Sequence, residues 1–204
     1  MHSPNSSYNI IITGVGGQGN VLSSQLIGQA FVRKGYFVTI GETYGASQRG
    51  GSVMSHIRVS SRKQLSPLIP KGKADIVIAL EPVEALRVIT HYGNPETVAI
   101  VNPRPVYPVD VSSGDEKYPA MEEIQKALTH LCRKVYYIPA TEKALAMGSA
   151  ILGNMIMIGA LLASKLLPLQ EEDFCRILAE TFRENRLTIN LQALAEGKKS
   201  IQGG

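Results

Sequence analysis

Metal-binding and redox side chains are scarce in this sequence. Its 204 residues include two cysteines, Cys132 and Cys175, which lie far apart and within helical patterns. They form neither a C-x-x-C redox pair nor the four-cysteine set of an iron-sulfur cluster, so we expect buried free thiols. None of the four histidines has paired metal-ligand spacing; they are His2, His56, His91 and His130. His56 shares a strand face with Arg58 and is predicted to be structural or interfacial, and no metal site is expected in this chain.

Charge and long apolar runs are also limited. The net charge is +4 and the basic residues are scattered, which argues against a nucleic-acid partner. Residues 1–9 lack the cationic start and apolar core of a signal peptide. The longest apolar segment, 151–167, is interrupted by polar residues and is too short to span a membrane comfortably, so we expect a central packed helix there. These absences predict a cytoplasmic protein with no membrane association.

Two signatures of self-contained catalysis are missing as well. No serine stands in a nucleophile elbow, so hydrolysis by a Ser-His-Asp triad is not expected. The spacing of Gly14 and Gly19 suits a P-loop, but Asn20 and Val21 stand where lysine and serine or threonine would meet the phosphates. The sequence therefore argues against an ATPase.

A glycine turn is the first positive signal. Gly14, Gly16 and Gly19 satisfy G-x-G-x-x-G between an apolar run at 8–13 and a helical repeat at 21–34. Such a turn lets a pyrophosphate approach the backbone, and the helix after it offers unpaired N–H groups and a positive dipole. The alternative is structural, in which the glycines only let the first helix cross the sheet closely.

Strand and helix patterns alternate along the rest of the chain. Strands are expected at 37–41, 52–59, 74–80, 98–101 and 135–138, and helices at 83–91, 121–131, after a Thr141 cap, within 151–167 and around 174–182. Such alternation predicts a parallel or mostly parallel sheet. We therefore expect one Rossmann-like α/β domain over 1–204, with three layers, a mostly parallel sheet and C-terminal helices. The role of the proline-rich segment 102–119 stays open.

A second glycine-rich segment follows at 41–51. Glu42 ends the strand at 37–41, near where a Rossmann domain places an acid for the ribose hydroxyls, as an NAD(P)-dependent dehydrogenase would require. The segment then becomes a long loop that holds one aromatic residue, Tyr44, and one cation, Arg49, among glycines. Loops of this kind usually meet a ligand or another chain.

Taken together, the two glycine segments resemble a known family. The sequences G-V-G-G-Q-G-N at 14–20 and G-E-T-Y-G-A-S-Q-R-G-G-S-V at 41–53 are similar to those of gamma-type small subunits of the 2-oxoacid:ferredoxin oxidoreductases. The nearest resemblance is to the indolepyruvate type, whose small subunit is called beta. The segments 153–155, 159–160 and 190–197 fit the same family, so the resemblance covers nearly the whole chain.

The resemblance implies a division of labour between two subunits. Enzymes of this family decarboxylate a 2-oxo acid on thiamine diphosphate, pass electrons through 4Fe-4S clusters to ferredoxin and release the acyl group to coenzyme A. This chain lacks cluster cysteines, and Gly114-Asp115 is followed by Glu116 instead of the glycine of a thiamine motif. A large alpha subunit is then implied to hold thiamine diphosphate, Mg²⁺ and the clusters in a heterotetramer. The small chain would be inactive alone and a homodimer when isolated, and no catalytic residue is assigned to it.

Two hypotheses follow for the site residues. In the first, the turn binds the diphosphate of coenzyme A through Gly14, Gly16, Gly17, Gln18 and Gly19. Arg58 or Lys63 would add positive charge. In the second, the loop contacts the large subunit or the mouth of the active site through Glu42, Tyr44, Gly45, Arg49, Gly50 and Gly51. Glu42 would then organise its own loop. A stand-alone NAD(P)-binding dehydrogenase and a non-catalytic interaction module are the alternatives.

Overall fold

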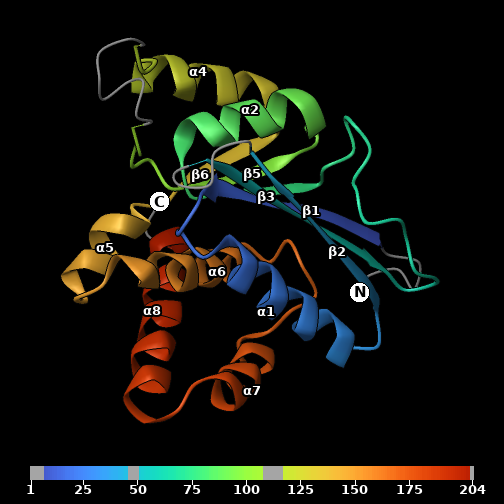
Figure 1. Cartoon of the computed structure of the whole chain (residues 1–204), viewed down its shortest axis with the longest axis vertical. Helices are drawn as coiled ribbons and strands as arrows, with labels where there is room; N and C mark the ends of the chain where they lie inside the picture. The colour runs from blue at the N-terminus through green and yellow to red at the C-terminus, as the bar shows by residue number, and fades with distance from the viewer. Residues whose placement is uncertain (1–6, 46–50, 108–116, 203–204) are drawn as a thin grey trace.

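A six-stranded sheet forms the middle layer of the protein, with helices on both faces (Figure 1). The computed structural model describes residues 7–45, 51–107 and 117–202. The strand order is β2-β3-β1-β4-β5-β6. The strands are β1 (Ser7–Val15), β2 (Phe37–Tyr44), β3 (Ser52–Ser60), β4 (Ile76–Ala79), β5 (Val98–Val101) and β6 (Lys134–Tyr137). Strands β1, β4, β5 and β6 are mutually parallel, and β3 runs antiparallel to both β1 and β2. The expected α/β domain with a mostly parallel sheet is confirmed.

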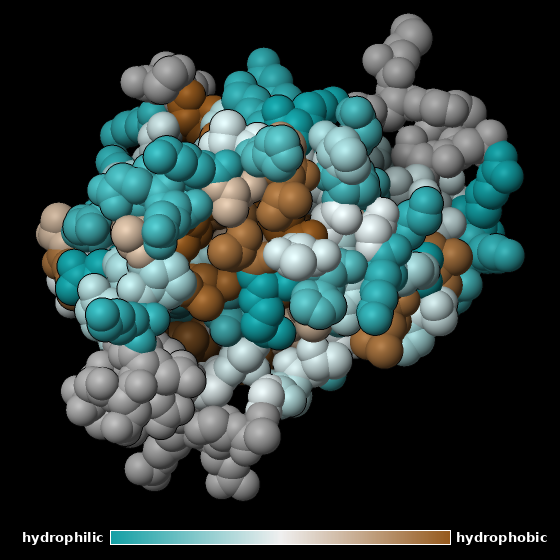
Figure 2. Space-filling view, turned by 90° about the horizontal axis from the view of Figure 1, so that it is seen from above, coloured by the Kyte–Doolittle hydropathy of each residue, from teal (hydrophilic) through white to brown (hydrophobic). Residues whose placement is uncertain are grey.

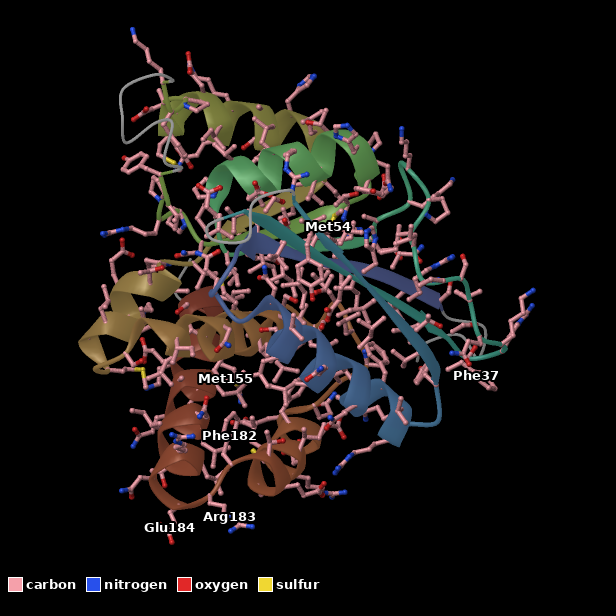
Figure 3. All side chains as sticks on the ribbon, in the orientation of Figure 1. Phe37, Met54, Met155, Phe182, Arg183 and Glu184 are labelled. Atoms are coloured by element: carbon pink, nitrogen blue, oxygen red, sulfur yellow. The ribbon has the colours of Figure 1, made fainter. Side chains whose placement is uncertain are left out.

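Uninterrupted apolar runs form the central strands because both faces of the sheet are covered. Every residue of β4 and β5 is buried. Successive side chains point to opposite faces. Ile10 and Ile12 of β1 therefore join one core, while Ile11 between them joins the other. Met54 and Met155, both labelled in Figure 3, likewise belong to the two different cores on opposite sides of the sheet.

The helices divide unequally between the two faces. One face carries α1 (Asn20–Arg33), α5 (Ala140–Ala146), the short 3₁₀ helix η1 (Ala150–Leu152), α6 (Gly153–Ala163), α7 (Glu171–Thr181) and α8 (Glu184–Gln202). The other carries α2 (Pro82–Tyr92) and α4 (Met121–Leu131). Figure 2 looks down on the layer of α2 and α4 and shows a mostly hydrophilic surface with apolar side chains gathered near its centre.

Helix α6 is the buried centre of the larger layer, as expected for the apolar segment. Its residues Gly153 to Leu161 are all buried. Two glycines bring its backbone against α8: a Cβ at Gly159 would lie 2.0 Å from the carbonyl oxygen of Leu194, and one at Gly197 would lie 1.9 Å from that of Ile156. Lys143 also forms an ion pair with Glu196 of α8 at 2.5 Å. The C-terminal helix is thus fixed by direct backbone contact.

Some local predictions were wrong. Strand β2 continues through Glu42 to Tyr44 instead of ending after residue 41, because it pairs with β3 along its whole length. Thr141 is not the cap of α5, since Pro139 occupies that position and Thr141 lies inside the first turn. Helix α8 was not predicted as an element at all.

Candidate functional site

The glycine turn lies at the carboxyl edge of the parallel strands, between β1 and α1. Helix α1 follows β1 onto one face of the sheet and α2 follows β4 onto the other, so the two connections diverge there. In open α/β sheets, ligands bind in the crevice at such a switch point. Two cavities of about 410 and 530 Å³ flank the turn, and both are lined by Gly17.

A chain of hydrogen bonds crosses this edge beneath the first cavity. The Gln18 side chain accepts from the Val15 N–H at 2.8 Å and donates to the Leu80 carbonyl at 3.1 Å. Asn102 donates to the same carbonyl at 3.1 Å and to Thr141 Oγ1 at 2.9 Å, and it accepts from the Thr141 N–H at 3.3 Å. These hydrogen bonds connect the ends of β1, β4 and β5 with the start of α5 beneath the first cavity. Gln18, predicted to bind the ligand, uses its carbonyl oxygen and its amide nitrogen within the protein.

Several backbone donors of the turn face no acceptor. The N–H of Gly16 donates to the Gly51 carbonyl at 2.9 Å and is therefore occupied. Within the described ranges, the N–H groups of Gly17 and Gly19 have no hydrogen-bond partner, and no side chain caps α1. Gly19 is the N-cap residue with φ 87°, a conformation that favours glycine. The uncapped N-terminus of a 14-residue helix thus meets the cavities, as a phosphate site requires.

Two buried amides beside the turn are also unsatisfied. Asn154, on the first turn of α6, is 3% exposed, and its Nδ2 has no partner among the described residues. Asn20 donates to the Val53 carbonyl at 3.3 Å, but its Oδ1 is buried without a partner in the same part of the chain. A Cβ at Gly19 would lie 2.4 Å from Asn154 Nδ2, so a larger residue there would displace the end of this side chain. Buried polar groups are normally paired, so two unpaired amide atoms beside the cavities are unusual.

The second cavity brings the two glycine segments together. It is lined by Gly16, Gly17 and Gly19 of the turn and by Tyr44, Gly45, Gly51 and Ser52 of the β2–β3 hairpin. The hairpin closes through a hydrogen bond from the Gly45 N–H to the Ser52 carbonyl at 2.7 Å. Tyr44 is 65% exposed and points its polar end at the hairpin itself. Arg49 and Gly50 lie outside the described residues.

Glu42 is not placed as a ribose-binding acid. Strand β3 lies between β2 and β1, so Glu42 is not on the strand adjacent to the glycine turn. Its carboxylate accepts a hydrogen bond from the Tyr44 hydroxyl. That bond is the main cause of the raised pKa of Tyr44. Glu42 therefore organises its own hairpin, as the interface hypothesis expects.

The cations predicted to assist the turn are at the wrong end of the sheet. Arg58 pairs with Asn9 near the start of β1, whereas the turn follows the end of that strand, about 20 Å away. Arg58 donates to Asn9 Oδ1 at 3.2 Å and to Ser66 Oγ at 2.8 Å. Lys63 follows the end of β3 at the same distant edge. Arg104, which sequence reasoning did not single out, lines the first cavity instead.

Sequence reasoning also missed the polar residues that directly follow the central strands. Asn102 is the first residue after β5, and Glu81 is the second residue after β4. Glu81 is 2% exposed, and burial raises the pKa of its carboxyl group. Their position at the carboxyl ends of buried strands was the signal that could have identified them.

Among the described residues, no group of three or more His, Cys, Asp or Glu side chains comes together that could hold a metal ion. Cys132 is buried, and burial raises the pKa of its thiol to about 11; Cys175 is half-buried. His56 is fully buried, accepts from the Ile69 N–H at 3.4 Å and packs edge-on against Tyr92, which agrees with a structural role. Across the described helices, none is long and apolar enough to span a bilayer.

Comparison with known proteins shows the family. The sequence model described as "Pyruvate ferredoxin/flavodoxin oxidoreductase" matches residues 9–200. The indolepyruvate oxidoreductase subunit IorB of Archaeoglobus fulgidus is 39% identical over 196 residues, which cover 96% of each chain. The NADH-dependent phenylglyoxylate dehydrogenase subunit gamma of Aromatoleum evansii is 24% identical over 95% of this chain and 94% of that relative.

Solved structures agree with these matches. The 2-oxoglutarate:ferredoxin oxidoreductase of Magnetococcus marinus, with 2-oxoglutarate, coenzyme A and succinyl-CoA bound, matches with a TM-score of 0.74 and 26% identity. The match covers 97% of this chain and 31% of that one. The pyruvate oxidoreductase subunit PORC of Thermotoga maritima shares the fold, with a TM-score of 0.71 at 19% identity over 95% and 96% of the two chains. The chain belongs to the pyruvate ferredoxin/flavodoxin oxidoreductase family.

Proposed function

We propose that this chain is the small subunit of an indolepyruvate-type ferredoxin oxidoreductase, a cytoplasmic enzyme that oxidatively decarboxylates arylpyruvates to acyl-CoA. The observation that carries the proposal is the 39% identity to an indolepyruvate oxidoreductase subunit over 96% of both chains. A large alpha subunit completes a heterotetramer and passes electrons to ferredoxin. That subunit holds thiamine diphosphate, Mg²⁺ and the 4Fe-4S clusters, which supply decarboxylation and electron transfer.

The contribution of this chain is to bind coenzyme A. Its diphosphate lies against the uncapped start of α1, where Gly17 and Gly19 offer unpaired N–H groups. Arg104 lines the neighbouring cavity and forms no ion pair with any described residue, so its charge is open to a phosphate. The proposal is supported by the relative from Magnetococcus marinus, whose structure contains coenzyme A.

The hairpin between β2 and β3 contacts the large subunit. Tyr44 is a large aromatic residue held in an exposed position by Glu42, and tyrosine is a residue type that anchors interfaces. Tyr107 and Ile151 are 58% and 61% exposed; Ile151 lines the first cavity, and Tyr107 directly follows its wall residue Val106. These exposed apolar side chains beside the cavities would be covered in the heterotetramer.

The first experiment recovers the complex. The tagged chain is purified anaerobically from its own cells, and viologen reduction is assayed with indolepyruvate, with and without coenzyme A. An iron-sulfur partner and reduction that depends on coenzyme A support the proposal. A chain that purifies alone and binds NADH saturably would overturn it in favour of a dehydrogenase.

A glycine substitution then tests the site. Gly17 and Gly35 have similar φ values of 93° and 82°, and a Cβ at either meets nothing within 4 Å among the described residues. Alanine therefore imposes the same backbone strain at both positions, but only Gly17→Ala places a methyl group in the cavities. We expect Gly17→Ala to raise the KM for coenzyme A about tenfold or more, with Gly35→Ala unchanged. Equal KM values for the two variants would refute the assignment.

A further inference from the structure

We infer that Glu81 is a positioning residue for the coenzyme A site: its buried carboxylate holds the cavity wall at 104–106 in place. The inference rests on the proposed function. Glu81 itself does not line the cavity, so it acts through the backbone that carries Arg104 and Val106.

The two carboxylate oxygens of Glu81 have separate partners. Oε2 accepts from the Glu84 N–H at 2.8 Å and so caps α2. Oε1 accepts from the Val106 N–H at 3.4 Å and from the Tyr118 hydroxyl. Oε2 therefore caps helix α2. Oε1 binds the segment between β5 and α4 at two places, Val106 after β5 and Tyr118 before α4.

A helix cap alone does not explain this residue. Serine, threonine, aspartate and asparagine are the usual caps, and burying a longer carboxylate costs free energy unless donors compensate for the lost water. Here Glu81 is 2% exposed, and no described cation pairs with it. Its extra length is needed to reach Val106 and Tyr118, while the cap needs only one oxygen.

The held segment forms the side of the first cavity. Arg104, Pro105 and Val106 all line that cavity. The ring of Tyr118 packs edge-on against the ring of Tyr107, with centroids 5.1 Å apart. The residues just before α4 therefore support the residues that follow β5. Only an ionised carboxylate accepts from all three donors without presenting a donor of its own. Without the hydrogen bonds to Oε1, the backbone at 104–106 would no longer be held in place, and neither would the charge of Arg104.

The test uses steady-state kinetics of the intact complex. Glu81→Asp retains a helix cap but is too short to reach the wall, and Tyr118→Phe removes one donor to Oε1 and leaves the cap. We expect both to raise the KM for coenzyme A about tenfold, with kcat and the KM for indolepyruvate within about twofold of wild type. Tyr36→Phe is the matched control, because it keeps the edge-on ring contact with Phe31 and lines neither cavity.

The outcomes separate this inference from the proposed function. If the wild-type complex does not depend on coenzyme A, the proposed function fails. If it does, but both variants keep the wild-type KM for coenzyme A and only lose thermal stability, Glu81 is merely structural and the inference fails. Should Glu81→Asp not fold, Tyr118→Phe decides the question by itself.

Discussion

Replacing Gly197 by alanine should destabilise the protein through the contact between α6 and α8. The new Cβ would lie 1.9 Å from the Ile156 carbonyl oxygen and 2.7 Å from its carbon. The obstacle is backbone, so no rotamer change relieves it, and the two helices must move apart by about 1 Å or more. Overpacking of this kind costs about 1–3 kcal/mol, while alanine regains at most about 1 kcal/mol of helix propensity. Because a Cβ 1.9 Å from a backbone oxygen places the overpacking cost at the upper end of this range, about 3 kcal/mol, we expect a net loss of about 2 kcal/mol.

Urea unfolding of the isolated chain, followed by circular dichroism, measures this loss. In a chain of this size, 2 kcal/mol corresponds to a melting temperature lower by about 4–8 °C. Gly153→Ala is the matched control, because a Cβ at that helical glycine meets the Ala140 carbonyl at an ordinary 3.7 Å. If Gly197→Ala is as stable as Gly153→Ala, the backbone contact does not require glycine and the reasoning fails.

Two further predictions concern buried polar groups. Burial lowers the pKa of His56 below its ordinary 6.5, so the stability that its neutral form contributes is present above pH 6.5 and is lost as the pH falls below that value. His56→Gln should therefore flatten the pH dependence of the urea midpoint across this range, whereas exposed His130→Gln should not; equal slopes would contradict the assignment. Gln18→Leu removes the hydrogen bonds to the Val15 N–H and the Leu80 carbonyl and should cost about 1–3 kcal/mol. Unchanged hydrogen exchange of the Val15 amide would show that this side chain does not hold the turn.

The main elements of the fold could be predicted from the sequence because local patterns determine them. The apolar runs of β4 and β5 and the helical repeats of α1 and α4 appear directly in the residues. The direction of β3 could not be predicted, since a strand pattern is the same in parallel and antiparallel pairs. Helix α8 was missed because it is held by long-range contact with α6, which no local period reveals.

The candidate site was only partly predictable. The glycine turn could be recognised in the sequence, because its backbone adopts a conformation that favours glycine. Gly19, for example, has a φ of 87°. The roles of Asn102, Glu81 and Arg104 depend on which strands are neighbours in the sheet. The strand order cannot be predicted from the local sequence. The same limit explains the error at Arg58, which was expected to add positive charge near the turn and lies at the opposite edge of the sheet.

The hydrogen bond from the Gly16 N–H to the Gly51 carbonyl has an evolutionary consequence. It joins two residues that lie 35 positions apart in the chain, because β3 pairs with β1 and its first residue, Ser52, lies opposite Val15 next to the turn. Both partners are main-chain groups, so the bond depends on the backbone paths of the two segments and not on their side chains. A chimera that takes residues 14–53 from one family member as a single block keeps these two paths together.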